Sequence, residues 1–246
     1  MNPKRKRKGR KLRLQMDLSD FYDLYPDSKC FVVGAGPSLA SLDLSGIHKH
    51  VVISINSSAM VMPWKDGDAD KRFWISNDVL CLRWSYFWTH VAKTQSVKIV
   101  RTSWKKHEDK LTGYNFRYFS VRKSEKHPLL ADDAGLCFTS SVPTGIDFAL
   151  RLGCKKVYLL GVDQTMVHGN SHFWQRWPKE SWPRRSDKKK YFRPEQKHQI
   201  KCFEHNEQVF MALHQEAKRK EVEIYNCSNT SRLKEFPLIS LDDALK

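Results

Sequence analysis

Short apolar runs rich in β-branched and aromatic residues recur along the chain, and polar residues or glycines end each one. Runs of this length and composition are typical of β-strands. Between several of them lie stretches with the residue spacing of helices. The predicted strands cover residues 30–34, 51–55, 72–76, 96–102, 115–121, 156–161 and 222–225.

Three stretches carry the apolar spacing of helices. In "WSYFWTHVAK" (84–93), four apolar side chains form one stripe, which indicates a helix facing the core. The stretch "TSSVPTGIDFALRLGCKK" (139–156) has the clearest ends, with Thr139 and Ser140 as caps and a glycine after the last turn. The last long helix is expected at about 200–218.

Strands that alternate with helices pair in parallel, so the expected fold class is α/β. We predict a Rossmann-like, mostly parallel sheet with helices on both faces. The chain of 246 residues suits one such domain over residues 21–246, preceded by a basic, disordered arm at 1–20. Residues 168–197 follow a predicted strand and precede the last long helix, and we expect this lid segment to cover a ligand.

Lysine and arginine outnumber the acidic residues by 43 to 27, which gives a formal net charge of +16. Part of this excess lies in "NPKRKRKGRKLR" (2–13), whose cations would bind a polyanion by releasing its counterions. The sequence shows no membrane span, no secretory signal and no amphipathic helix beside the arm. Its six cysteines are scattered singly. We therefore expect a cytoplasmic protein with reduced thiols, no membrane partner and no zinc site.

The first predicted strand runs into a turn, "GAGPSL" (34–39), that resembles a phosphate-binding loop. Gly34 and Gly36 lack Cβ atoms, so a ligand is expected to approach the backbone closely. Pro37 stiffens the exit, and Ser38 is placed to cap the next segment or donate to a phosphate. A third glycine and a Gly-Lys-Ser/Thr sequence are both missing, which argues against a dinucleotide fingerprint and against a P-loop.

Polar side chains follow other predicted strands at the same edge of the sheet. The second strand ends at Asn56, the third at Asn77 and Asp78, and the sixth at Asp163. Such amides and carboxylates are suited to hydrogen bonds with a base or a ribose. The helix start at 139–141 adds unpaired backbone N–H groups, which favour a phosphate.

This order of motifs resembles the family 42 sialyltransferases. The resemblance rests on G-x-G-P-S-L, a strand ending in Asn, a Thr-Ser-Ser helix start and "LGCKKVYLLGVD" (152–163). It covers roughly residues 28–165. The same features, with "VEIYNCSNTSRLKEFPLISLDDAL" (222–245), also resemble the MptE-like 6-hydroxymethylpterin diphosphokinases and related bacterial and phage proteins.

The sialyltransferase resemblance implies a nucleotide-activated sugar as donor, with no metal and no tightly bound cofactor. The nucleotide would be held by residues 35–38, which include Ala35, and by Asn56. The phosphate would lie at Thr139, Ser140 and Ser141, and Asn77 or Asp78 would match the amide of the third strand. Two departures leave the donor's identity open: Ser141 replaces a glycine of the family pattern, and Ala35 replaces an asparagine.

In the same family a histidine of the lid region acts as general base on the acceptor hydroxyl. A neutral imidazole suits this role at pH 7. We favour His198, which follows the lid and precedes a helix, over His168 and His172. With Asp163 at its strand end, His198 and His168 form the candidate catalytic set.

The lid also suggests an acceptor. Its tryptophans alternate with cations, a combination typical of nucleic-acid contact, although sugars stack on tryptophan as well. We therefore expect DNA as acceptor or partner, for example through a hydroxymethylated base as in phage DNA modification. The candidate contacts are Trp174, Arg176, Trp177, Arg184, Arg185 and Lys189.

Two alternatives remain open. An MptE-like diphosphokinase would move pyrophosphate from ATP to a small alcohol with Mg²⁺, and the D-x-D spacing in "DGDAD" (66–70) would then suit a divalent cation. A non-catalytic nucleic-acid-binding module would instead bind DNA in a salt-dependent way, without turnover.

Overall fold

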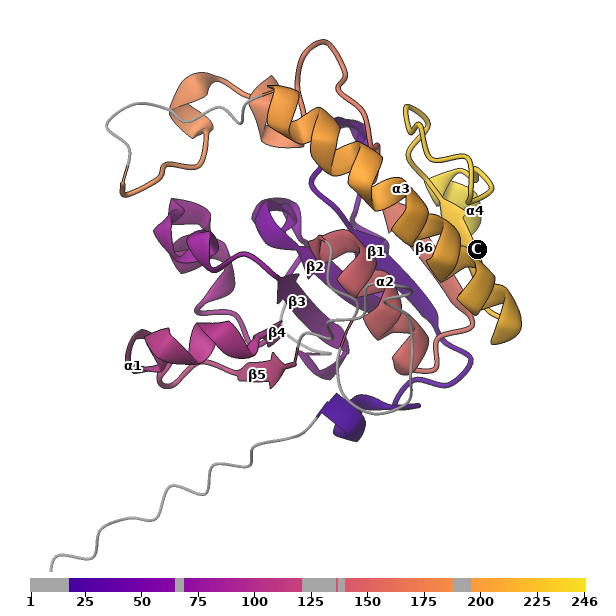
Figure 1. Ribbon diagram of the computed structural model, residues 1–246, viewed down its shortest axis with the longest axis horizontal. Helices are drawn as coiled ribbons and strands as arrows, with labels where there is room; N and C mark the ends of the chain where they lie inside the picture. Colours follow the sequence, from indigo (N-terminus) through magenta and orange to yellow (C-terminus); the bar gives the residue numbers. More distant parts are fainter. Residues whose placement is uncertain (1–17, 65–68, 121–135, 137–139, 188–195) are drawn as a thin grey trace, which may run out of the picture.

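The computed structural model describes residues 18–64, 69–120, 136, 140–187 and 196–246. Its centre is a seven-stranded sheet in which every neighbouring pair is parallel, in the order β5-β4-β3-β2-β1-β6-β7 (Figure 1). The strands are β1 (Lys29–Val33), β2 (Val51–Ile55), β3 (Arg72–Ser76), β4 (Val97–Arg101), β5 (Phe116–Phe119), β6 (Lys156–Leu160) and β7 (Glu223–Asn226).

All seven predicted strands are present, and the predicted fold class is confirmed. β2 and β3 have the predicted bounds. The strand expected at 115–121 is shorter, since β5 ends at Phe119. The described helices are α1 (Glu108–Leu111), α2 (Ser141–Arg151), α3 (Gln196–Arg219) and α4 (Leu241–Leu245).

The strand order places a change of direction between β1 and β6. The chain adds β2 to β5 on one side of β1, then returns to add β6 and β7 on the other side. The connections that follow β1 and β6 therefore lead to opposite halves of the sheet, β1 to β2 and β6 to β7. Parallel α/β proteins bind ligands in the crevice that such a change of direction opens.

Helices α2 and α3 cover one face of the sheet, as Figure 1 shows. Phe148 of α2 and Phe210 of α3 are fully buried in one cluster with Val32, Ile53 and Phe73 of the strands. The close approach of α2 depends on a glycine in its middle, Gly145, because a Cβ there would lie 2.8 Å from the side chain of Ile55. α2 thus rests directly on the strands that lead to the crevice.

The other face is covered by short 3₁₀ turns, a π-helical turn and α4. The helix predicted at 84–93 is present but shorter, and its main part is a π-helical turn at Phe87–Val91. Two members of its predicted apolar stripe, Phe87 and Val91, are buried, and Trp84 and Trp88 are half-buried. Phe87 packs with Trp74 and Trp104 in a fully buried aromatic cluster.

The ends of the long helices differ little from expectation. Ser140 is the N-cap of α2, although its side chain makes no capping hydrogen bond. α3 begins at Gln196, four residues before the predicted start. Most of the predicted arm lies outside the described residues, and its last three residues belong to the 3₁₀ turn Leu18–Phe21. None of the described helices has the length and apolar character to cross a membrane.

Candidate active site

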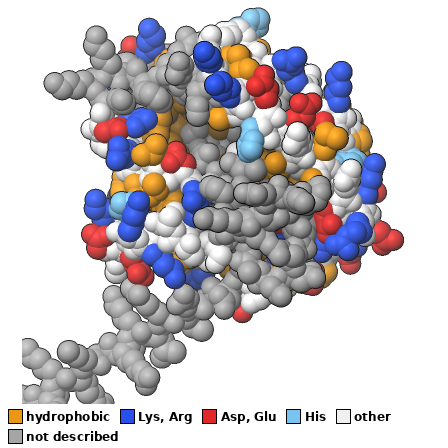
Figure 2. All heavy atoms as spheres, viewed as in Figure 1, with side chains coloured by type: hydrophobic (Ala, Val, Ile, Leu, Met, Phe, Trp, Pro, Cys, Tyr) orange, Lys and Arg blue, Asp and Glu red, His pale blue; other side chains and the backbone are white. Residues whose placement is uncertain are grey.

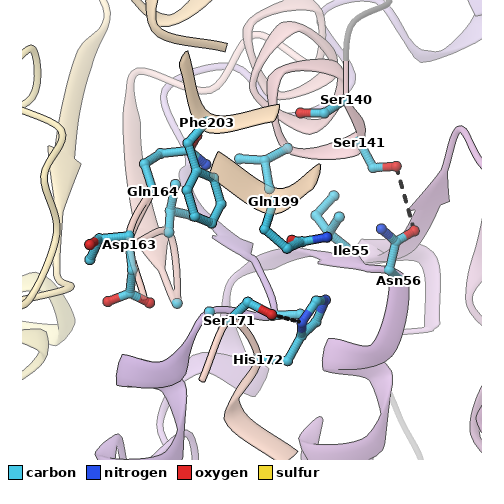
Figure 3. A pocket seen from close by; sticks show the side chains of 16 residues that line it. Ile55, Asn56, Ser140, Ser141, Asp163, Gln164, Ser171, His172, Gln199 and Phe203 are labelled. Carbon is cyan, nitrogen blue, oxygen red and sulfur yellow. Dashed lines mark hydrogen bonds between the residues drawn. The ribbon is translucent and has the colours of Figure 1, made fainter. Parts of the chain in front are cut away.

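A pocket lies at the carboxyl ends of β1, β2 and β6, beneath the N-terminus of α2 (Figure 3). It encloses about 580 Å³, a volume that includes space open to solvent. The lid segment and α3 complete its walls. The lining residues are Ala35, Gly36, Ile55, Asn56, Ser140, Ser141, Val142, Gly161, Val162, Asp163, Gln164, Thr165, Ser171, His172, Gln199 and Phe203.

The glycines of the first turn are required by protein packing. The N–H of Gly36 donates to the carbonyl of Gly161 over 2.8 Å, so the loops after β1 and β6 lie against each other. A Cβ on Gly34 would lie 2.5 Å from that same carbonyl oxygen, and one on Gly36 would lie 2.1 Å from Asp163 Oδ2. The close approach of the second loop is thus a reason for both glycines that the sequence did not show, and the approach of a ligand to Gly36, which lines the pocket, stays a prediction.

The carboxylate of Asp163 joins three parts of the chain. Its Oδ2 accepts hydrogen bonds from the backbone N–H of Ser38 (3.2 Å) and from the Ser38 hydroxyl (2.9 Å). Its Oδ1 accepts one from the hydroxyl of Thr230, in the C-terminal segment. Asp163 is 2% exposed, and burial raises its pKa. The Ser38 hydroxyl is therefore engaged with Asp163, and the expected bond to a phosphate would require it to leave that partner.

Thr230 did not emerge from the sequence as a site residue. Its only signal was the C-terminal stretch "NCSNTS" (226–231), which carried part of the family resemblance. In the structure that stretch supports the loop after β6: Ser228 Oγ accepts from the N–H of Val162, and Ser231 Oγ donates to the Val162 carbonyl. The C-terminal segment thus fixes the wall of the pocket from behind.

The polar ends of β2 and β3 meet the start of α2. Ser141 Oγ accepts a hydrogen bond from the N–H of Asn77 (2.9 Å) and lies 3.5 Å from Asn56 Oδ1. Asn77 Nδ2 donates to Thr144 Oγ1 over 2.8 Å. Asn56 and Ser141 line the pocket, whereas Asn77 is buried behind them. Asn77 is thus placed to hold the helix start, and Asn56 to contact a ligand.

The N-terminus of α2 points its first turn at the pocket. Ser140, Ser141 and Val142 all belong to the lining. The first N–H groups of a helix have no partner within the helix, and the helix dipole makes this end positive. The arrangement favours an anion such as a phosphate. Thr139 lies outside the described residues.

Asp78 does not belong to the lining. Its carboxylate caps the 3₁₀ turn Val79–Arg83 by accepting a hydrogen bond from the N–H of Leu80 (2.8 Å), and the residue is exposed. Of the two candidates on the third strand, the structure places Asn77 against α2 and leaves Asp78 at the surface.

The lid tryptophan nearest the pocket is part of the core. Trp174 is 2% exposed, and its indole N–H donates to Ser57 Oγ. Its ring packs against Trp84 and Trp182, with centroids 6.1 and 5.4 Å away. The backbone N–H of Phe173 donates to the carbonyl of Ala35, which ties the lid to the first turn. The expected stacking of Trp174 on a base is therefore blocked in this structure.

The remaining lid candidates differ in exposure. Arg176 and Arg184 are exposed, and Trp177 is half-buried. Arg185 binds the carboxylate of Asp187 through two nitrogens (2.9 and 2.6 Å). Its guanidinium also lies over the ring of Trp84. Lys189 lies outside the described residues.

The three candidate histidines lie in different places. His168 is exposed and does not line the pocket. His172 lines it, and burial lowers the pKa of its imidazole to about 4. His198 lies in the first turn of α3, the helix that contributes Gln199 and Phe203 to the lining, and its side chain is not described.

No group of three or more His, Cys, Asp or Glu side chains suited to a metal ion occurs within the described ranges. The D-x-D stretch at 66–70 falls mostly outside those ranges. The polar groups of the described lining are backbone groups, amides, hydroxyls, one carboxylate and one imidazole, and the apolar side chains of Ile55, Val142, Val162 and Phe203 complete it.

Replacement of Asp163 by Ala should destabilise the fold and the pocket together. Each buried donor left unpaired costs about 1–3 kcal/mol, and Asp163 serves three donors. Urea unfolding of D163A should show a loss of at least about 2 kcal/mol. The exposed carboxylate of Asp242 provides the matched control, and D242A should change stability by less than about 0.5 kcal/mol. Equal effects of the two variants would contradict this role of Asp163.

No family model and no curated protein matches the chain. Two solved structures of Campylobacter jejuni enzymes are similar to it. The sialyltransferase CstII in complex with cytidine-5'-monophosphate is 16% identical, with 87% of this chain and 86% of that chain covered and a TM-score of 0.51. The monofunctional α-2,3-sialyltransferase Cst-I is 13% identical, with 86% and 80% covered and a TM-score of 0.51. At these identities the likeness confirms a sialyltransferase-like fold, while the resemblance to MptE-like proteins stays a prediction.

Proposed function

We propose that this protein is a glycosyltransferase that moves a sugar from a nucleotide-activated donor to an acceptor hydroxyl. The observation that carries the proposal is the convergence of the α2 N-terminus, Asn56 and the Ala35–Gly36 turn on one pocket. The same fold binds cytidine-5'-monophosphate in CstII. These groups are hydrogen-bond donors and acceptors of the kind that hold a nucleotide and its phosphate.

In the proposed reaction the acceptor oxygen forms a bond to the anomeric carbon of the sugar. The bond from that carbon to the phosphate oxygen breaks, and the nucleotide phosphate leaves with the electron pair. The proton of the acceptor hydroxyl passes to a general base, for which we propose His198. Its position supports this role, because the neighbouring Gln199 and the next turn of α3 line the pocket.

A cytidine nucleotide should raise the melting temperature of the protein. A ligand that binds only the folded state stabilises it by about 2.7 kcal/mol at one hundred times its Kd. We expect CMP to act more strongly than AMP, GMP and UMP, and EDTA to have no effect. Asn56→Ala should remove most of the shift, whereas Ser103→Ala, exposed and outside the lining, should keep it. Stabilisation by ATP alone, and only with Mg²⁺, would instead favour pyrophosphate transfer.

Replacement of His198 by Ala should reduce kcat for transfer by about 10²–10⁴-fold, the usual contribution of a general base. The Kd for CMP should change little, because the proton is removed only in the chemical step. His205, an exposed histidine on the same helix, gives the matched control His205→Ala. Steady-state rates and CMP titrations on both variants separate the effect on kcat from the effect on the Kd. If H198A kept the wild-type kcat, His198 would not be the general base.

We propose DNA with a hydroxymethylated base as the acceptor. The net charge of +16 and the exposed lid cations Arg176 and Arg184 support this choice. Acidic and basic side chains of the described residues are intermixed on the face drawn in Figure 2. The described residues therefore show no continuous positive patch there, and the proposal depends on the charge of the whole chain.

Sugar transfer should be detected on duplex DNA that contains 5-hydroxymethylcytosine and not on the unmodified duplex. The rate should fall steeply as salt is raised, because each phosphate contact releases counterions. Donor turnover on oligosaccharides serves as the comparison. Transfer to oligosaccharides alone, unaffected by competing DNA, would contradict the DNA acceptor and leave the glycosyltransferase proposal intact.

A further inference from the structure

The pocket that we assign to an anionic donor contains no lysine or arginine among its described lining residues. Asp163 is an acid, and among the described lining side chains only the imidazole of His172 can take up a proton to become a cation. A phosphate bound here would meet the positive end of α2, amides and hydroxyls. The balance of charge therefore depends on the protonation state of His172.

The hydrogen bonds around His172 favour the tautomer with its proton on Nδ1. Gln175 Oε1 accepts hydrogen bonds from the backbone N–H groups of Ser171 (2.7 Å) and His172 (2.9 Å). The same oxygen lies 3.2 Å from Ser171 Oγ, so the serine hydroxyl must be the donor to it. Ser171 Oγ is then the acceptor for His172 Nδ1, 2.9 Å away.

This chain of bonds leaves the other nitrogen, Nε2, with a lone pair. Figure 3 shows the imidazole turned into the pocket, with its bond to Ser171 on the far side of the ring from Asn56. The His172 ring also packs on Trp174, with centroids 5.2 Å apart, which fixes its plane. Protonation at Nε2 would therefore add a new N–H donor inside the pocket without breaking the bond to Ser171.

Burial lowers the pKa of this imidazole to about 4, which favours its neutral form. The charged group that shares the lining is Asp163, whose carboxylate is bonded to Ser38 and Thr230. On α3, Lys201 and Glu204 are exposed and opposite in sign, and His198, the proposed base, is the titratable residue next to the lining residue Gln199. Tyr86, on the segment next to Trp84 and Trp174, is neutral because burial raises its pKa.

We propose that binding of the donor's phosphate protonates His172 at Nε2, so that the imidazolium supplies the positive charge that the pocket lacks. The inference rests on the proposed function, because it takes the phosphate of a nucleotide-activated donor as the anion. An opposite charge a few ångströms away favours the charged form of histidine. After transfer, the same N–H would stabilise the negative charge on the departing nucleotide phosphate.

The proposal makes donor affinity depend on pH in one direction. Binding takes up a proton wherever the pH lies above the pKa of His172 in the free protein and below its pKa in the complex. In that window the Kd should rise by up to about tenfold for each pH unit. Binding is therefore tightest at low pH and weakens as the pH rises through the window.

The test uses CMP-3FNeuAc, the substrate analogue with which CstII has also been solved. Its phosphodiester and its carboxylate do not titrate between about pH 5 and 8. Calorimetric titrations over this range should show the Kd for wild-type protein rising with pH, and proton uptake close to one per analogue near pH 6. His172→Gln should bind more weakly at low pH and with no dependence on pH.

Two controls test whether the pH dependence of binding comes from the imidazole of His172 or from other groups. His90→Gln removes an exposed histidine outside the lining and should keep the wild-type pH dependence. Cytidine, which lacks the phosphate, should bind without proton uptake. In long-range ¹H–¹⁵N spectra, His172 should change from the neutral Nδ1–H form to imidazolium when the analogue is added.

The outcomes are distinguishable. Binding of CMP-3FNeuAc that does not vary with pH, or a pH dependence that persists in H172Q, would overturn the role of His172 while the proposed function stands. A neutral His172 in the spectrum of the saturated complex would do the same. Failure of the analogue and of CMP to bind at any pH would overturn the cytidine donor and, with it, the role of His172 in binding that donor.

Discussion

The buried carboxylate of Asp163 is the interaction on which the geometry of the pocket depends. It accepts hydrogen bonds from Ser38 and Thr230, residues that are far apart in the chain. Because a carboxylate presents two oxygens, it can hold the β1 turn on one side and the C-terminal segment on the other. Gly36 lies so close to it that any side chain would displace Oδ2. The glycine and the aspartate therefore form one unit, and neither position can change alone.

The described lining of the pocket contains no lysine or arginine, so an anionic donor would be held there by dipoles. A helix N-terminus, amides and hydroxyls are dipoles already oriented by the fold, and they need little reorganisation when an anion enters. The helix start is fixed through Asn77, which contacts both Ser141 and Thr144. The described lysines and arginines lie outside this lining, so in the proposed function the groups that bind the donor differ from those that attract a polyanionic acceptor.

The sequence predicted the fold well because the strands of a covered parallel sheet are short apolar runs with clear ends. Five of the predicted nucleotide and phosphate contacts, Ala35, Gly36, Asn56, Ser140 and Ser141, do line the pocket, because parallel strands all end at one edge. The pairing of Ser38 with Asp163 was out of reach, because it joins residues 125 positions apart. Trp174 was predicted to contact nucleic acid because it lies in a basic loop, but it is buried in the core. The sequence does not distinguish a tryptophan that faces solvent from one that faces the core.

The structure shows what the two departures from the family pattern, Ala35 and Ser141, change in hydrogen bonding. Ser141, in place of a glycine, uses its hydroxyl to accept from the N–H of Asn77 and to approach Asn56, so it links β2, β3 and α2. Ala35, in place of an asparagine, brings no amide to the lining, and its carbonyl is already bound by the N–H of Phe173. Compared with the family pattern, the β1 turn therefore lacks one side-chain amide, and the start of α2 has one additional hydroxyl. In the proposed function, recognition of the donor would therefore depend on Asn56 and the first turn of α2, where the phosphate is proposed to bind.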